Sequence, residues 1–199
     1  MQAIFENAYT WFIFNEEKKL NFNGLYLKVG ASFALVDPPP LSEQDQAFIS
    51  ETGKPSFIYL TNKHHTRGSA DHRKRWGAKL FIHKKDAPLM EIPVDGTFGD
   101  GETLSGELQV LRIPDAKTPG ECAFWWKRNK TLVVGDAVIG KPAGGLSMLP
   151  DEKFKNPMLA RQGLSVLREF DFDRLLVGDG TSLLGNAKKI FENFIAASN

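Results

Sequence analysis

The sequence has little cysteine, little net charge and no long apolar run. Cys122 is the only cysteine among 199 residues, which excludes an internal disulfide and favours a reducing, cytoplasmic environment. The 25 Lys and Arg residues nearly balance the 24 Asp and Glu residues, so we expect neither nucleic acid nor a membrane surface as a partner. No apolar stretch approaches the roughly 18 residues that span a bilayer. The N-terminal residues lack the basic start and small-residue cleavage site of a signal peptide, so none is expected.

The remaining composition is that of a globular protein. With 42% hydrophobic and 25% charged residues, the chain can bury a sizeable core, and we expect residues 1–199 to form one domain. Strand-like and helix-like segments interleave, and Gly30 divides residues 24–36 into a hairpin, which argues against a purely parallel sheet. We therefore predict an α+β fold of two mixed sheets flanked by helices. The predicted helices cover residues 42–52, 69–76, 156–169 and 182–197.

Polar or charged residues follow several predicted strands directly. The segment 61–68 (TNKHHTRG) follows one apolar run, and Asp136 and Asp179 each follow a Gly at the end of another. Loops just beyond strand ends are where folds commonly place functional groups. Taken singly, an Asp after a Gly is commonly a turn or a helix cap. Two adjacent histidines form a metal site only when other ligands converge on them.

In their order, these segments resemble the metallo-β-lactamase superfamily of αββα hydrolases. The resemblance implies a four-layer αββα sandwich and hydrolytic chemistry at a site with two metal ions. It covers most of the chain, and its specificity comes from the order of the segments rather than from any single motif. The matching segments are residues 24–38 (opening hairpin ending in Asp-Pro), 57–87 (strand, ligand loop, helix and strand), 95–121 (Asp-Gly turn and Thr-Pro-Gly), 131–136 (strand and aspartate) and 174–190 (final strand and turn).

The metal-ligand pattern that the resemblance implies is only partly present. The family loop reads His-x-His-x-Asp-His, and here that frame holds, in order, Asn62, Lys63, His64, His65, Thr66 and Arg67. By the same resemblance, Lys117 replaces a histidine and Asp179 replaces another, while Asp136 keeps the bridging carboxylate. Only His64 and Asp136 therefore match the family's ligand types.

Positive side chains at two ligand positions work against two bound metal ions. A protonated lysine does not ligate, and neither does a guanidinium. At about 4 Å and an effective dielectric constant near 20, two unit charges repel by roughly 4 kcal/mol, and a divalent ion doubles that repulsion. We predict instead a metal-free network without a cofactor, in which Lys117 and Arg67 pair with acids. The alternative is that both side chains point to solvent. The predicted cleft comprises Asn62, His64, His65, Thr66, Arg67, Lys117, Asp136 and Asp179.

The expected function is that of a hydrolase-like protein without the standard metal-dependent hydrolysis. Its cleft would serve a small-molecule ligand or an unidentified reaction, with His64, Asp136 and Lys117 as candidate catalytic residues. One alternative keeps a single Zn, Fe or Mn ion on His64, Asp136 and Asp179, which activates water for ester or thioester hydrolysis. Another is a non-catalytic scaffold or regulatory protein, with a homodimer formed through the aromatic strand 8–14.

Other candidate residues have simpler interpretations. His65 fills an unconstrained position of the loop and could still turn inward. His72 and His83 are expected to be surface or structural residues, and Cys122 a small core residue rather than a nucleophile. The Gly- and Pro-rich loop at residues 140–155 is expected to border the cleft.

Overall fold

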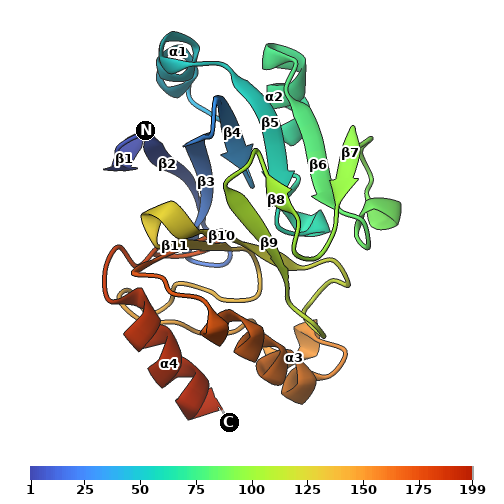
Figure 1. The fold of residues 1–199 in the computed structure, drawn as a ribbon, viewed down its shortest axis with the longest axis vertical. Coiled ribbons are helices and arrows are strands. Elements are labelled where there is room, and N and C mark those ends of the chain that lie inside the picture. Colours follow the sequence, from blue (N-terminus) through green and yellow to red (C-terminus); the bar gives the residue numbers. More distant parts are fainter. Residues whose placement is uncertain (199) are drawn as a thin grey trace.

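The computed structural model describes residues 1–198, which form two β-sheets packed against each other (Figure 1). The first sheet is antiparallel from β1 to β4 and parallel from β4 to β7. Its strands are, in order, β1 (Gln2–Phe5), β2 (Ala8–Asn15), β3 (Leu20–Val29), β4 (Ser32–Val36), β5 (Pro55–Leu60), β6 (Lys79–His83) and β7 (Gly96–Phe98). The second sheet is antiparallel except for the parallel pair β11 and β12. Its strands are, in order, β12 (Arg174–Val177), β11 (Thr131–Val134), β10 (Cys122–Trp126), β9 (Leu108–Arg112) and β8 (Thr103–Leu104).

Helices cover the outer faces of both sheets. In Figure 1, α1 and α2 lie beside the first sheet, and α3 and α4 lie below the second. The helices are α1 (Glu43–Thr52), α2 (Ser69–Trp76), α3 (Pro157–Gly163) and α4 (Ala187–Ser198). The predicted α+β class with two mixed sheets and flanking helices is confirmed. Within residues 1–198, every helix is too short or too polar to cross a bilayer.

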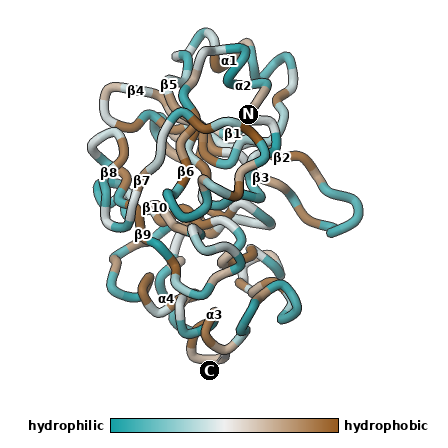
Figure 2. The backbone as a smooth tube through the Cα atoms, turned by 90° about the vertical axis from the view of Figure 1, so that its right-hand side faces the viewer, coloured by the Kyte–Doolittle hydropathy of each residue, from teal (hydrophilic) through white to brown (hydrophobic). Residues whose placement is uncertain are grey.

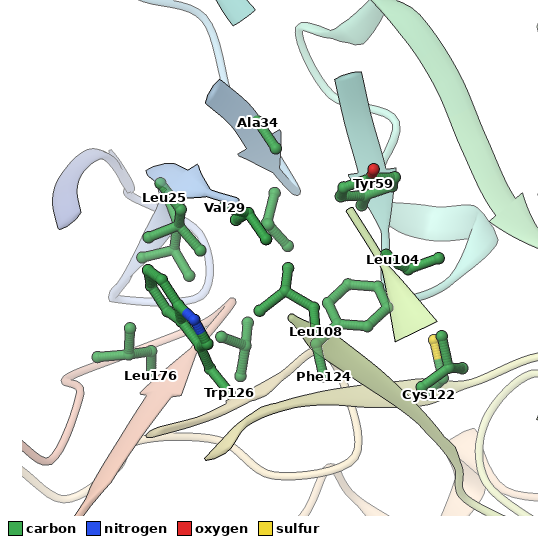
Figure 3. Close-up of a cluster of buried hydrophobic side chains, with 14 of the residues drawn as sticks. Leu25, Val29, Ala34, Tyr59, Leu104, Leu108, Cys122, Phe124, Trp126 and Leu176 are labelled. Carbon is green, nitrogen blue, oxygen red and sulfur yellow. The ribbon is translucent and has the colours of Figure 1, made fainter. Parts of the chain in front are cut away.

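The core between the sheets is built from the inward side chains of both. In Figure 3, Leu25 and Val29 of β3 face Leu108, Phe124 and Trp126 of β9 and β10, and all five are buried. Burying a large apolar side chain completely stabilises a fold by about 1.5–3 kcal/mol. This shared layer therefore fixes the position of one sheet relative to the other, and with it the position of the strand ends.

The predicted start and end of the first helix are confirmed. The Ser42 hydroxyl accepts a hydrogen bond from the backbone N–H of Asp45, which satisfies one of the donors left open at a helix start. Gly53 follows the last helical residue and donates its backbone N–H to the carbonyl of Ile49. The helix predicted over residues 69–76 also matches α2.

Two predicted helices differ from the structure. The α3 helix ends at Gly163, and the chain continues as 3-10 turns over Leu164–Glu169. A Cβ atom at Gly163 would lie 2.1 Å from the carbonyl oxygen of Pro114, so the chain passes very close to a neighbouring loop there. The α4 helix begins at Ala187 rather than at residue 182, because Leu183 pairs with Leu175 beside β12.

The C-terminal ends of β4, β5, β11 and β12 meet at one end of the sandwich. Each strand pair is parallel, so its C-terminal ends lie together in its own sheet. The ion pair between Arg67, beyond β5, and Asp179, beyond β12, shows that the ends of the two sheets meet. Asn23 of β3 links the two sheets there by donating its backbone N–H to Gly178 at 2.8 Å. The residues that follow these strand ends within two positions are Asp37, Thr61, Asp136 and Asp179.

The hairpin formed by β2 and β3 extends beyond the sandwich (Figure 2). Its apolar residues Phe12, Ile13 and Phe14 are exposed, and its turn is hydrophilic. This segment includes part of the aromatic strand 8–14. The homodimer expected through that strand stays a prediction.

Candidate functional site

His65 and Asp37 form a deeply buried ion pair at this end of the sandwich. His65 Nδ1 lies 2.7 Å from Asp37 Oδ2, and both side chains are buried. Asp37 also accepts hydrogen bonds from Thr61, through the backbone N–H at 2.9 Å and the hydroxyl at 2.6 Å. The carboxylate is therefore fixed by three donors, and it sets the orientation of the imidazole ring.

The second ring nitrogen of His65 faces two groups of opposite charge. Nε2 lies 3.5 Å from Asp136 Oδ1 and 3.3 Å from Arg67 Nη2. Burial by itself lowers the pKa of His65, and the Arg67 charge lowers it further. The carboxylates of Asp37 and Asp136 outweigh both effects and raise the pKa to about 10. The imidazole is therefore a cation at neutral pH.

Lys117 forms an ion pair with Asp136 where the network meets solvent. Its Nζ donates to Asp136 Oδ2 at 2.7 Å, and the two side chains are 19% and 4% exposed. Burial raises the pKa of Asp136, but the charges and hydrogen bonds of His65 and Lys117 hold it well below its usual range. Asp136 is therefore ionised, and both of its oxygens face cations.

Arg67 forms an ion pair with Asp179 and connects three chain segments. Its Nη2 donates to Asp179 Oδ1. Its Nη1 donates to the backbone carbonyls of Asn23 at 3.1 Å and Gly178 at 3.2 Å. The guanidinium also lies 4.5 Å from the centre of the Phe22 ring, a cation–π contact. Arg67 therefore points into the site and not to solvent.

A hydrogen-bonded pair, Asn62 and Glu121, completes the buried part of the site. Asn62 Nδ2 donates to Glu121 Oε1 at 3.2 Å. Burial raises the pKa of the fully buried Glu121 well above its usual range, and the nearby Asp136 raises it further. Its Oε2 has no hydrogen-bond partner among the described residues. The ion pairs of the network join three cations to three anions: His65 to Asp37, Arg67 to Asp179, and Lys117 to Asp136.

Two residues of the predicted cleft lie outside this network. His64 is exposed, and its ring forms no hydrogen bond with residues 1–198, although its backbone N–H donates to Asn62 Oδ1 at 2.8 Å. Partial burial and the nearby Lys117 lower the pKa of His64, so its ring is neutral at pH 7. The Thr66 hydroxyl forms no hydrogen bond in the described part of the chain. The inward histidine is His65, because the 3-10 turn Lys63–His65 directs it between the sheets.

Three residues of the network are ones that the sequence pattern did not single out: Asp37, Thr61 and Glu121. The signal for Asp37 is its position between a buried strand and the Pro38–Pro40 segment, where an acid at a strand end must find donors. Glu121 carries no comparable signal, because nothing in its local sequence indicates complete burial.

His72, His83 and Cys122 are structural. His72 Nε2 hydrogen-bonds to the carbonyl of Pro39 at 2.9 Å, and His83 Nε2 to Asp100 at 2.6 Å. Both rings are buried, and burial lowers the pKa of each. Cys122 is fully buried, which raises the pKa of its thiol, so it packs as a core residue.

Among the residues that the structure describes, one group of side chains has donor atoms close enough to hold a metal ion. Single ligand atoms of His65, Asp136 and Asp179 lie within 4.8 Å of one another. This group contains His65 in the place expected for His64. However, Lys117 already binds Asp136, Arg67 already binds Asp179, and neither cation is a ligand. This donor set does not fit the two divalent ions that the resemblance implies, because both ions would lie against fixed positive charges.

Comparisons with known proteins agree with this architecture. A family model described as the metallo-beta-lactamase superfamily matches residues 3–198. Among solved structures, TTHA1623 in a di-iron-bound form has a TM-score of 0.71 at 21% identity, covering 90% of this chain and 98% of that one. The metallo-beta-lactamase from Pontibacter korlensis has a TM-score of 0.71 at 16% identity, covering 96% and 98%. The DIM-1 metallo-beta-lactamase has a TM-score of 0.72 at 18% identity, covering 96% of each chain. No curated protein matches the chain.

Proposed function

Because this chain belongs to the metallo-β-lactamase superfamily, we propose that it is a metal-independent member whose cleft binds a small molecule. In this proposal the standard metal-dependent hydrolysis is lost. The observation that carries the proposal is the ion pair of Lys117 with Asp136, at 2.7 Å. The side chain at a ligand position is itself the counter-ion of the carboxylate that the family uses to bridge its metals.

The charge balance of the site supports this proposal. A buried carboxylate that loses its only counter-ion commonly destabilises a protein by about 3–5 kcal/mol. In the family the counter-ions are bound metals, whereas here Arg67 and Lys117 supply positive charge through the chain itself. The site therefore needs no divalent ion to supply counter-ions to Asp136 and Asp179.

The accessible groups indicate what kind of ligand the cleft accepts. Lys117 is the most exposed charged side chain of the network, at 19%, compared with 11% for Arg67. The exposed ring of His64 lies near enough to Lys117 for the lysine charge to lower its pKa. Both groups donate hydrogen bonds, so the cleft suits a ligand with a carbonyl or anionic oxygen. Lys117 would also stabilise negative charge that develops on such an oxygen.

Metal analysis of the purified protein tests this proposal. Protein produced in medium supplemented with zinc, iron and manganese should contain less than about 0.1 equivalent of each metal per chain. A strong chelator should leave the melting temperature within about 1 °C, because no bound ion stabilises the fold. Near-stoichiometric metal that a chelator removes, with loss of stability, would overturn the proposal.

A second candidate function is that of a single-metal hydrolase, favoured by the proximity of His65, Asp136 and Asp179. These residues would hold one ion, which when bound would supply a Lewis acid for ester or thioester hydrolysis. The same metal analysis separates the two candidates. About one equivalent of metal, absent from His65→Ala and retained in His64→Ala, would favour the single-metal enzyme. Metal lost from His64→Ala and retained in His65→Ala would instead favour the set with His64.

A further inference from the structure

A hollow lies at the end of the sandwich opposite the charge network. Its volume is about 730 Å³, within the range of small-molecule sites. Lys130 precedes β11 and Arg174 begins β12, whereas Asp136 and Asp179 follow the other ends of these two strands. The lengths of the strands therefore separate the hollow from the network.

Three tight turns form the rim of this hollow. Asn7, Gly30 and Lys130 lie at turns between successive strands, and their φ angles are 62°, 58° and 44°. Backbone hydrogen bonds brace the turns: Lys28 donates to the carbonyl of Asn7 at 2.9 Å, and Asp173 donates to the carbonyl of Lys130 at 2.8 Å. The rim is thus formed before any ligand arrives, which lowers the entropic cost of binding.

Two of the acidic residues that line the hollow already have partners. Glu107 accepts a hydrogen bond from Trp126 Nε1 at 2.6 Å and lies 3.7 Å from Arg128. Asp173 Oδ1 accepts the backbone N–H of Asn186 at 2.9 Å. The carboxylates of Glu107 and Asp173 therefore interact with other groups of the protein. The third acid, Glu6, is exposed at the rim.

Two basic residues of the hollow form no ion pair within residues 1–198: Arg174 and Lys28. Arg174 donates through Nη1 to the carbonyl of Asn129 at 3.1 Å, and its guanidinium lies 5.1 Å from the centre of the Phe5 ring. A guanidinium carries five N–H donors in a rigid plane. The Asn129 carbonyl and the Phe5 ring fix the plane of Arg174 and leave most of its donors for a ligand. Such a fork matches the oxygens of a phosphate or a carboxylate.

An aromatic wall lies beside this guanidinium. The rings of Phe5 and Trp126 are 5.7 Å apart, and Phe5 is the more exposed of the two. We propose that the hollow binds a small organic anion, whose phosphate or carboxylate pairs with Arg174 and whose apolar part packs on Phe5. Lys28 adds a second positive charge at the rim. This site does not depend on the function proposed for the charge network.

Calorimetric titration with four probes tests the proposal: phenyl phosphate, benzoate, inorganic phosphate and benzylamine. Phenyl phosphate should bind about tenfold more tightly than inorganic phosphate, because only the former reaches the aromatic wall. Benzylamine should not bind, since its charge has the wrong sign. Whether phenyl phosphate or benzoate binds more tightly shows whether the site prefers a phosphate or a carboxylate.

Variants locate the binding site. Arg174→Gln should weaken phenyl phosphate binding by about tenfold or more, and Lys28→Gln by roughly threefold. Phe5→Leu should weaken phenyl phosphate but not inorganic phosphate, which provides a readout independent of Arg174. Arg73→Gln is the matched control, because Arg73 pairs with Asp95 outside the hollow, and it should leave the affinity unchanged. The proposal is overturned if Arg174→Gln changes the affinity for phenyl phosphate less than about twofold, or if benzylamine binds as tightly as phenyl phosphate. It is also overturned if phenyl phosphate shifts the backbone amide NMR signals of residues 62–67 instead of those around the hollow.

Discussion

The two ends of β11 and β12 differ in how the charged residues near them are surrounded. Beyond the C-terminal end of β11, Asp136 is buried and every neighbouring charge has a partner. At the N-terminal end of β12, Arg174 lines an open hollow, and no acidic side chain of residues 1–198 pairs with it. A charge without a counter-ion is tolerated at the open end because water solvates it, and it is not tolerated at the buried end. The same type of substitution should therefore have very different consequences at the two ends.

The largest difference is expected between two lysine substitutions. Lys117→Met should lower the free energy of unfolding by roughly 1.5–3 kcal/mol, because it removes a charged hydrogen bond to Asp136, whose other oxygen still faces the protonated His65. Lys130→Met should leave the free energy of unfolding nearly unchanged, because Lys130 and its partner Asp171 are 62% and 70% exposed and solvent screens their interaction. Urea denaturation of both variants measures the contrast. Equal losses would show that the two ends do not differ in this way.

A smaller effect is expected from the pH dependence of the buried end. The pKa of His65 is raised to about 10, so the stability gained from protonated His65 is fully present below its unfolded pKa near 6.5 and is lost as the pH rises through about 10. The difference in unfolding free energy between the wild type and His65→Gln should therefore be largest below pH about 6.5 and shrink toward pH about 10. Comparing the two proteins cancels the contributions of His72 and His83, because His65 is not among the causes of their pKa shifts. A difference that grows with pH would contradict the assignment of His65 as a cation.

The smallest effect is expected at the rim of the hollow. Lys28→Gln should change the unfolding free energy by less than about 0.5 kcal/mol, because Lys28 is exposed and forms no ion pair within the described residues. The same variant is expected to weaken anion binding. A large loss of stability would show that Lys28 maintains the fold rather than the ligand site.

Much of the fold could be predicted from local sequence. Apolar strands, the Ser42 cap and the glycines that end elements indicated the layers and the first two helices correctly. The start of α4 could not be predicted in this way, because Leu183 is held by pairing with Leu175 rather than by its local pattern. The end of α3 likewise depends on a close approach to Pro114.

Those residues of the candidate site could be predicted whose place is determined by their position relative to a strand end. Lys117, Arg67, Asp136 and Asp179 follow from the frame of the family, and the structure places all four in one network. The choice between His64 and His65 was not predictable, because a single 3-10 turn decides which ring faces inward.

The distant partners of the network were also beyond sequence reasoning. Asp37 pairs with a histidine 28 positions further along the chain, and no local pattern reports such a contact. Glu121 was missed for a related reason: its burial depends on the loop that carries Asn62. Buried polar groups at strand ends are determined by tertiary contacts, and only the requirement that each finds a partner can be stated in advance.

Anomalous diffraction from crystals grown with added zinc tests the central claim most directly. The account predicts the Lys117 ammonium group within hydrogen-bond distance of Asp136, Arg67 against Asp179, and no anomalous peak between the two carboxylates. Two strong anomalous peaks at that place, with Lys117 and Arg67 turned toward solvent, would contradict it.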